Sequence, residues 1–214
     1  MPIVCPAILA PDPHEYREQM EKIAPFAERI QIDLTDGIFA NSRTVKPAEA
    51  WWPVGIKSDF HLMYKNPTNA VNTILEHQPN MVIVHCEANG HFESFANHCH
   101  RQGVKIGVAL LQRTSIESIL PALHNIDHVL IFSGDLGNFG GHANLGLLSK
   151  VQVLRDHKPD IEIGWDGGIN NQNISTLATA GVDVFNVGGY IQKAADPEHA
   201  YKVLSRIADE TGTT

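Results

Sequence analysis

Short apolar runs rich in β-branched residues recur along the chain, and a stretch with helical spacing of its apolar positions follows each run. The pattern therefore predicts eight consecutive strand–helix units, the second of which has a looser loop and only a short helical segment. The strands are predicted at residues 3–9, 29–34, 55–62, 81–85, 104–110, 128–132, 161–165 and 182–187. The helices are predicted at residues 13–26, 47–52, 67–77, 91–102, 115–123, 145–157, 171–180 and 197–210.

Regular alternation of strands and helices indicates parallel strand pairing, and eight such units can close into a barrel. The alternative is an open, doubly wound sheet, which usually carries a glycine-rich turn after its first strand. Here the glycines cluster after the sixth, seventh and eighth strands instead. We therefore expect a single (β/α)₈ barrel domain over residues 1–214, at the short end of the range for this fold.

Several polar residues are predicted to cap helices or turns. Asp12 precedes Pro13, which suits the first position of a helix, and Asn66 precedes another proline in the same way. Asp36 lies just beyond the second strand and is interpreted as a turn residue rather than a catalytic one. The tail, residues 210–214, is expected to be frayed.

Composition narrows the class of protein. The hydrophobic content of 43% indicates a globular core, and the net charge of -8 argues against nucleic acid as a partner. Neither a signal peptide nor an apolar run of membrane-spanning length is recognisable. The three cysteines, Cys5, Cys86 and Cys99, lack metal-type spacing and are interpreted as reduced thiols. We therefore expect a cytoplasmic protein without nucleic-acid or membrane partners.

Polar side chains end three of the predicted strands. Asp33, His61 and Asp166 each close an apolar run, and Gln31 shares a strand face with Asp33 because the two are two residues apart. The carboxyl ends of barrel strands form the usual active-site face, and a buried carboxylate needs a partner or a function. We predict that these side chains form one functional cluster. His85 fits equally well as a histidine bonded to a neighbour.

Three glycine turns follow the last strands, at residues 137–141, 166–170 and 187–189. Glycine allows the backbone to approach a ligand closely and to expose consecutive N–H donors, and phosphate sites after strands seven and eight recur in this fold. Glycines also permit tight turns without any ligand. The predicted phosphate-binding residues are Gly140, Gly141, Gly167, Gly168, Gly188 and Gly189.

Several motifs occur in order between Pro6 and about Ile191. They are Pro6-Ala7-Ile8-Leu9, Gln31-Ile32-Asp33-Leu34-Thr35-Asp36-Gly37 with Phe39, His61-Leu62-Met63, Val84-His85-Cys86-Glu87-Ala88, Phe139-Gly140-Gly141, Asp166-Gly167-Gly168-Ile169 and Gly188. With these motifs the sequence resembles the ribulose-phosphate 3-epimerase family. The resemblance implies a barrel enzyme with a divalent metal, zinc, iron or manganese, that inverts C3 of a pentulose 5-phosphate in the pentose phosphate pathway.

The resemblance also implies roles for individual residues. Asp33, His61 and Asp166 would ligate the metal, with Gln31 at the place of a family histidine, and the two aspartates would be the acid–base pair. Met63 and His85 would contact substrate beside the glycines already named. Members of the family form dimers or hexamers, so a homo-oligomer is expected. Trp51, Trp52 and Phe60 are candidates for its interface, or for ordinary packing between barrel and helices.

The sequence departs from the family pattern at several positions. Gln31 is a weak ligand for the softer metals, so the metal could be absent. Ala7 replaces a substrate-contacting serine, Thr35 and Phe132 replace methionines, and Gly189 replaces a serine that follows the last strand. The loop after the sixth strand is about one residue longer than usual.

Three hypotheses therefore stay open. The first is a sugar-phosphate 3-epimerase that interconverts D-ribulose 5-phosphate and D-xylulose 5-phosphate by proton transfer between two aspartates with metal assistance. The second is a related phosphosugar isomerase or lyase with an altered metal or none. The third is a phosphosugar-binding paralogue without turnover. Metal content and proton exchange at C3 distinguish them.

Overall fold

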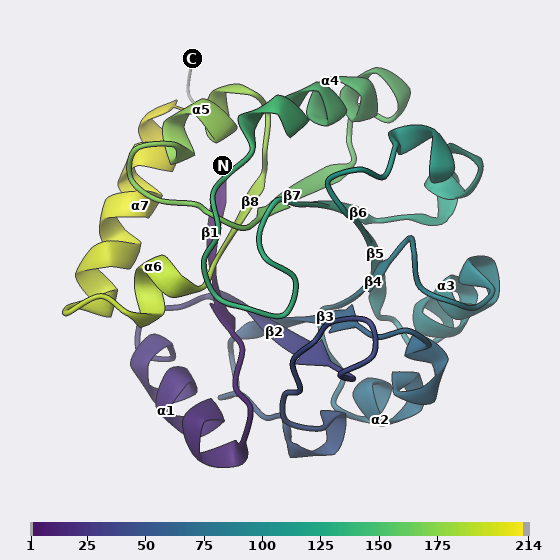
Figure 1. Cartoon of the computed structure of the whole chain (residues 1–214), viewed down its shortest axis with the longest axis horizontal. Coiled ribbons are helices and arrows are strands. Elements are labelled where there is room, and N and C mark those ends of the chain that lie inside the picture. Colours follow the sequence, from purple (N-terminus) through teal and green to yellow (C-terminus); the bar gives the residue numbers. More distant parts are fainter. Residues whose placement is uncertain (1, 212–214) are drawn as a thin grey trace.

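The computed structural model describes residues 2–211, in which eight parallel strands form a closed barrel. Each strand pairs with its neighbours in chain order, and β1 closes the barrel against β8 (Figure 1). The predicted barrel is confirmed, and the open doubly wound sheet is wrong. The strands are β1 Ile3–Ile8, β2 Arg29–Thr35, β3 Lys57–Met63, β4 Met81–His85, β5 Lys105–Leu110, β6 His128–Phe132, β7 Glu162–Asp166 and β8 Val184–Val187.

The helices surround the barrel as a ring (Figure 1). The α-helices are α1 Pro13–Ile23, α2 Val71–Glu76, α3 Phe92–Arg101, α4 Leu148–His157, α5 Ile174–Thr179, α6 Gly189–Gln192 and α7 Pro197–Thr211. The 3₁₀ helices are η1 Pro47–Glu49, η2 Pro67–Asn69, η3 Ile116–Ser118, η4 Leu120–Asn125 and η5 Leu145–Leu147.

The fifth strand–helix unit differs most from the prediction. Instead of one α-helix over residues 115–123, the chain forms the two 3₁₀ helices η3 and η4. Pro121 lies near the start of η4, lacks an N–H donor and disfavours α-helical backbone at Leu120, so a continuous helix cannot form there. The helix predicted at 67–77 is divided in the same manner into η2 and α2, and α6 was not predicted.

The predicted caps are confirmed where the structure tests them. Asp12 accepts hydrogen bonds from the backbone N–H groups of residues 14 and 15, at 2.9 and 3.0 Å, and Pro13 begins α1. Asn66 caps η2. Asp36 accepts from three backbone N–H groups of its own loop and of the β3 loop. Burial opposes ionisation of Asp36, but these bonds lower its pKa below the ordinary value. Residues 212–214 of the expected frayed tail lie outside the described residues, whereas α7 continues to Thr211.

The apolar core has two layers. A large cluster fills the space between the strands and the helices, where Trp165 and Phe60 are fully buried. A small cluster of Met81, Ile83, Ala109 and Leu130 fills the barrel itself. Phe60 belongs to the outer layer, which fits ordinary barrel–helix packing for this residue. Because apolar side chains occupy the middle of the barrel, the polar side chains that face its interior lie toward its two ends.

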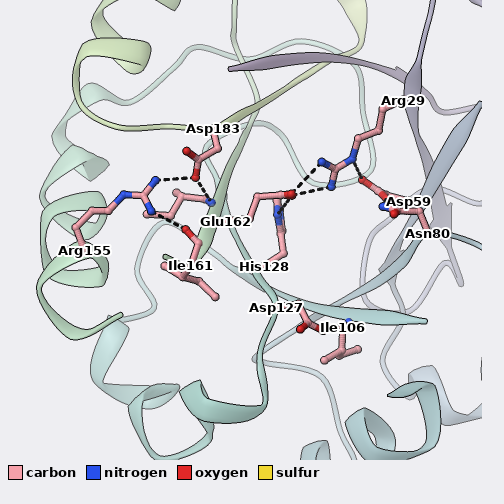
Figure 2. A network of polar contacts seen from close by, with 11 residues as sticks. Arg29, Asp59, Asn80, Ile106, Asp127, His128, Arg155, Ile161, Glu162 and Asp183 are labelled. Carbon is pink, nitrogen blue, oxygen red and sulfur yellow. Dashed lines mark hydrogen bonds and ion pairs between the residues drawn. The ribbon is translucent and has the colours of Figure 1, made fainter. Parts of the chain in front are cut away.

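A polar network occupies the amino-terminal end of the barrel (Figure 2). Arg29 donates to Asp59 at 2.6 Å and makes a two-pronged ion pair with Glu162 at 2.9 and 3.0 Å. His128 contacts Glu162 at 3.3 Å, and Asn80 donates to Asp59 at 2.6 Å. A buried charge needs a partner, and the network supplies partners for the guanidinium group of Arg29. The strands β2, β3, β6 and β7 therefore meet around this group.

Other sequence-based expectations concern thiols and membranes. Cys5 and Cys99 are buried, Cys86 is half-buried, and all three are free thiols. Among residues 2–211, none of the helices combines the length and apolarity needed to cross a membrane.

Candidate active site

Three ionisable side chains converge at the carboxyl end of the barrel. Asp33 and His61 each lie two residues before the end of their strands, β2 and β3, and Asp166 ends β7. Their side chains face the barrel axis because alternate residues of a strand face the same way. One potential ligand atom from each lies within 4.8 Å of the others. The structure thus brings together the three residues that the sequence placed at strand ends.

Gln31 connects the two carboxylates. Its Nε2 donates to Oδ1 of Asp33 at 2.9 Å and to Oδ2 of Asp166 at 2.6 Å. His61 contributes from the other side, with Nδ1 at 2.8 Å from Asp33 Oδ1 and at 3.7 Å from Asp166 Oδ2. One amide and one imidazole therefore hold both carboxylates in a fixed arrangement.

The cluster carries more negative charge than its burial favours. Burial raises the pKa of Asp166 above its usual range, and the nearby charge of Asp33 raises it further. Burial alone would lower the pKa of His61, but the hydrogen bond and charge of Asp33, with the charge of Asp166, raise it. Two carboxylates and one imidazole at this separation therefore attract a cation, either a proton or a metal ion.

The donor set fits a divalent metal. Two carboxylate oxygens and one imidazole nitrogen are ligands that zinc, iron and manganese accept. Gln31 offers a further atom, because its Oε1 is buried without a hydrogen-bond partner. The oxygen and nitrogen ends of a carboxamide have nearly the same shape, so a half-turn brings the oxygen between the two aspartates. Asp33, His61, Asp166 and Gln31 can therefore surround one ion.

Behind the cluster, a chain of contacts continues away from the cavity. His61 Nε2 lies 2.9 Å from His85 Nε2, and His85 Nδ1 faces Glu87 Oε2 at 3.5 Å. Phe39 packs on the His85 ring with a centroid separation of 4.8 Å. His85 is not among the residues that line the cavity at the mouth, and its ring contacts His61 instead. This position of His85 agrees with the alternative interpretation of the residue as a histidine bonded to a neighbour.

A cavity of about 260 Å³ opens above the two aspartates. The loop after β6 crosses the mouth of the barrel (Figure 1), and its Gly137 packs against Ala40 and Ser42 of the β2 loop. Asp33 and Asp166 lie on the cavity wall, as do all six glycines of the predicted phosphate site. The cavity therefore joins the carboxylates to the glycine turns.

The glycines of the cavity wall differ in whether their surroundings leave room for a side chain. A side chain at Gly167 or Gly168 would collide with the backbone of the β6 loop, and one at Gly188 would collide with the Phe139 ring. These three positions require glycine for packing between loops. Gly140 and Gly189 instead have room for a Cβ atom.

Sequence reasoning missed one cation at this site. Lys193 lines the cavity together with Tyr190, both on or next to the short helix α6. The sequence signal for this cation is the position of Lys193 four residues after the Gly188-Gly189 pair. Its place beside the cavity, however, depends on the turn of α6, which the sequence pattern did not predict. The glycine-rich side of the cavity therefore carries a positive charge.

The positions that depart from the family pattern also have structural explanations. Ala7 and Phe132 line the cavity together with the retained Met63, and the three side chains supply an apolar wall beside the carboxylates. Thr35 has a different position, because its hydroxyl donates to the carbonyl of Ser42 at 2.7 Å and holds the β2 loop. Thr35 thus fixes a loop at a position where the family has a methionine.

The fold is shared with solved structures of other proteins. A 3-hexulose-6-phosphate synthase from Salmonella typhimurium aligns over 97% of this chain and 99% of that chain, with a TM-score of 0.72 at 15% identity. KGPDC from Streptococcus mutans aligns over 99% of both chains, with a TM-score of 0.79 at 12% identity. At these identities the likeness concerns the fold alone.

Sequence comparison is more specific. The sequence model of the Ribulose-phosphate 3 epimerase family matches residues 3–192. A ribulose-phosphate 3-epimerase from Mycobacterium leprae is 32% identical over 97% of this chain and 95% of its own length. One from Schizosaccharomyces pombe is 25% identical over 94% of this chain and 91% of its own. The chain therefore belongs to the ribulose-phosphate 3-epimerase family.

Proposed function

We propose that this protein is a sugar-phosphate 3-epimerase that interconverts D-ribulose 5-phosphate and D-xylulose 5-phosphate. The observation that carries this proposal is the pair Asp33 and Asp166, held by Gln31 and His61 on the wall of a cavity that also contains the glycine turns. Membership of the family supports the same reaction.

Inversion at C3 needs two proton-transfer groups. The C3 hydrogen is acidic only because it is adjacent to the C2 carbonyl, so a carboxylate must lie within reach of it. Asp33 and Asp166 come from different strands of the barrel, β2 and β7, and both border the cavity. One aspartate takes the proton from one face of C3, the other returns a proton to the opposite face, and the roles exchange in the reverse direction.

Asp33, His61 and Asp166, with the carbonyl end of Gln31, would hold the divalent ion that the family resemblance implies. When bound, this ion supplies positive charge beside the oxygen on which charge develops. Met63 and Phe132 line the same cavity and exclude water from the carbanionic carbon.

The phosphate group is proposed to bind at the other end of the cavity. The turns at residues 166–170 and 187–189 offer backbone N–H groups, and Lys193 offers an ammonium group. A phosphate fixed there positions C3 of a five-carbon sugar near the aspartates. The ligand class is therefore an open-chain ketose phosphate.

One observation supports a second candidate. The Nε2 of Gln31 donates to both aspartates at once, a position in which an amide takes over part of the charge-neutralising role of an ion. A phosphosugar isomerase that needs no metal is the alternative function. Activity after removal of metal separates the two.

The test is conversion of ribulose 5-phosphate by protein loaded with Zn²⁺, Mn²⁺ or Fe²⁺, followed by NMR. We expect xylulose 5-phosphate to form, and we expect a chelator to abolish its formation. The variant Asp166→Asn should lose conversion by 10³-fold or more while the sugar phosphate still raises the Tm. Binding without conversion by every metal-loaded form would instead identify a phosphosugar-binding protein.

A further inference from the structure

We propose that Glu87 is a positioning residue that fixes the tautomers of His85 and His61, so that His61 Nδ1 presents its lone pair to an ion between Asp33 and Asp166. The proposal rests on the metal site of the proposed function. It assigns a role to a residue that neither lines the mouth cavity nor contacts the carboxylates.

The contact between the two imidazole rings is a hydrogen bond, which requires a proton on one of the two facing nitrogens and a lone pair on the other. His61 Nε2 and His85 Nε2 lie 2.9 Å apart, so one nitrogen must donate and the other must accept. The exposed fractions of the two residues are 0% and 2%, so neither nitrogen can exchange this partner for bulk water. Phe132 packs against both rings, with centroid separations of 5.9 and 5.8 Å. The direction of this hydrogen bond therefore determines the tautomer of each neutral ring.

Two directions are conceivable. If His61 donates, its proton is on Nε2, and Nδ1 has a free lone pair toward the aspartates. His85 then carries its proton on Nδ1, pointing at Glu87. If His85 donates instead, its Nδ1 lone pair points at Glu87, and the neutral His61 has its proton on Nδ1, where it cannot ligate an ion.

Glu87 decides between these directions. His85 Nδ1 and Glu87 Oε2 face each other at 3.5 Å, and both atoms are buried without another hydrogen-bond partner. The other oxygen of Glu87 is fixed, because it accepts from the backbone N–H of Leu111 at 3.0 Å and from the Thr114 hydroxyl. A lone pair opposite a carboxylate is repelled, whereas an N–H group is attracted. His85 must therefore carry its proton on Nδ1.

The charge state of Glu87 agrees with this role. Burial would raise the pKa of Glu87, but the interactions with His85, Thr114 and Leu111 lower it to about 2. Glu87 is thus an acceptor at neutral pH. The lone pair of His61 Nδ1 then lies 2.8 Å from Asp33 Oδ1, and it is satisfied by a metal ion or, in the metal-free protein, by a proton shared with Asp33. Mutation of groups that orient metal-binding histidines by hydrogen bonds commonly changes metal affinity 10–100-fold, and Glu87 acts on His61 through one such group, His85.

The variant Glu87→Gln tests the proposal because we expect it to reverse the hydrogen bond between His85 and His61 without changing the size of the side chain at position 87. The glutamine oxygen can still accept from Leu111 and Thr114, which turns the amide NH₂ group toward His85 Nδ1. That nitrogen must then accept, so the proton of His85 moves to Nε2 and the hydrogen bond to His61 reverses. Glu117→Gln is the matched control, because Glu117 is exposed on η3.

The first measurement is ¹⁵N NMR of the histidine rings in the metal-free proteins. We expect His85 to carry its proton on Nδ1 in the wild type and in Glu117→Gln, and on Nε2 in Glu87→Gln. An unchanged His85 tautomer in Glu87→Gln, with the fold intact by thermal unfolding, would overturn the proposal.

The second measurement is the affinity for Zn²⁺ or Mn²⁺ alone, by competition with a chelator. Glu87→Gln should bind 10–100-fold more weakly than the wild type, and Glu117→Gln should match the wild type. Equal affinities in all three proteins would refute the role of Glu87. A wild type that binds neither ion would refute the metal site of the proposed function, and with it the effect of the His61 tautomer on metal binding. The role of Glu87 in fixing the tautomers is decided by the NMR spectra alone.

Discussion

Gln31 is the residue at which this site departs most from the resemblance. It occupies the place of a family histidine, and its amide links Asp33 and Asp166 by two hydrogen bonds. Imidazole is a better ligand than a carboxamide for zinc and iron. Under the proposed function, residue 31 would therefore set how tightly the cluster holds a metal ion.

We predict that Gln31→His binds Zn²⁺ at least 10-fold more tightly than the wild type, because an imidazole nitrogen replaces a weak amide ligand. Chelator competition measures the affinity. Gln31→Ala serves as the control, since it removes the amide without adding a ligand and should bind no more tightly than the wild type. An affinity for Gln31→His at or below that of the wild type would mean that position 31 does not contribute to a metal site.

The glycine turns give a second prediction at the scale of single residues. Gly168 has a φ of +72°, and a side chain there would meet the backbone of the β6 loop, so Gly168→Ala should lower stability by about 1–3 kcal/mol. Gly189 has ordinary space around it, and Gly189→Ser should change stability by less than about 1 kcal/mol. Urea unfolding of both variants checks the difference. Equal losses would show that the loops do not pack as described.

The sequence predicts some site residues better than others for a physical reason. Asp33 lies near the end of an apolar strand and Asp166 ends another, and parallel strands of a barrel bring their carboxyl ends to one face, so spacing alone places them together. Lys193 and Glu87 could not be found in that way. Their positions depend on the path of the short helix α6 and on contacts between the β4 and β5 loops, which periodicity does not encode.

Among the elements, strands are predicted more accurately than helices. A buried barrel strand needs a continuous apolar run, and the strands at 81–85 and 128–132 match their predicted bounds. The fifth helix fails because Pro121 limits the backbone to short 3₁₀ turns. The loop after β6 crosses the mouth, a course that its glycines permit but do not specify.

The polar network at the amino-terminal end predicts how the strands respond to acid (Figure 2). Burial would raise the pKa of Glu162, but His128 and Arg29 lower it well below the ordinary value. A carboxylate whose pKa is lowered by folding stabilises the fold above its unfolded pKa of about 4.3 and loses this contribution as pH falls below that value. The network should therefore weaken in acid.

We predict that Glu162→Gln lowers the free energy of unfolding by on the order of 3 kcal/mol at pH 7, because Arg29 loses one of its two carboxylate partners. The difference from the wild type should shrink as pH falls below about 4.3. Urea unfolding between pH 7 and pH 3 measures it. Glu198→Gln, which removes an exposed ion pair with Lys202, is the control and should change little. A difference independent of pH would contradict the assignment.

At the scale of the whole molecule, the number of strand–helix units, together with the glycine clusters after the last three strands, predicted a closed barrel. Closure itself follows from pairing of β1 with β8, which brings the two ends of the strand series together. The predicted homo-oligomer stays a prediction. Trp51 is 39% exposed and remains a candidate for an interface between subunits.

The fold alone does not decide the reaction, because the same barrel occurs in a synthase and in phosphoribosyl anthranilate isomerases. The proposed reaction is supported by the position of two carboxylates beside one cavity, together with the family membership of the chain. The central claim is therefore a claim about proton transfer at one carbon atom.

The most direct test of that claim is incorporation of solvent deuterium into ribulose 5-phosphate. Metal-loaded wild type in D₂O should introduce deuterium at C3, and Asp33→Asn and Asp166→Asn should each lose this exchange. Absence of deuterium at C3 with Zn²⁺-, Mn²⁺- and Fe²⁺-loaded protein, although the sugar phosphate binds, would contradict the account.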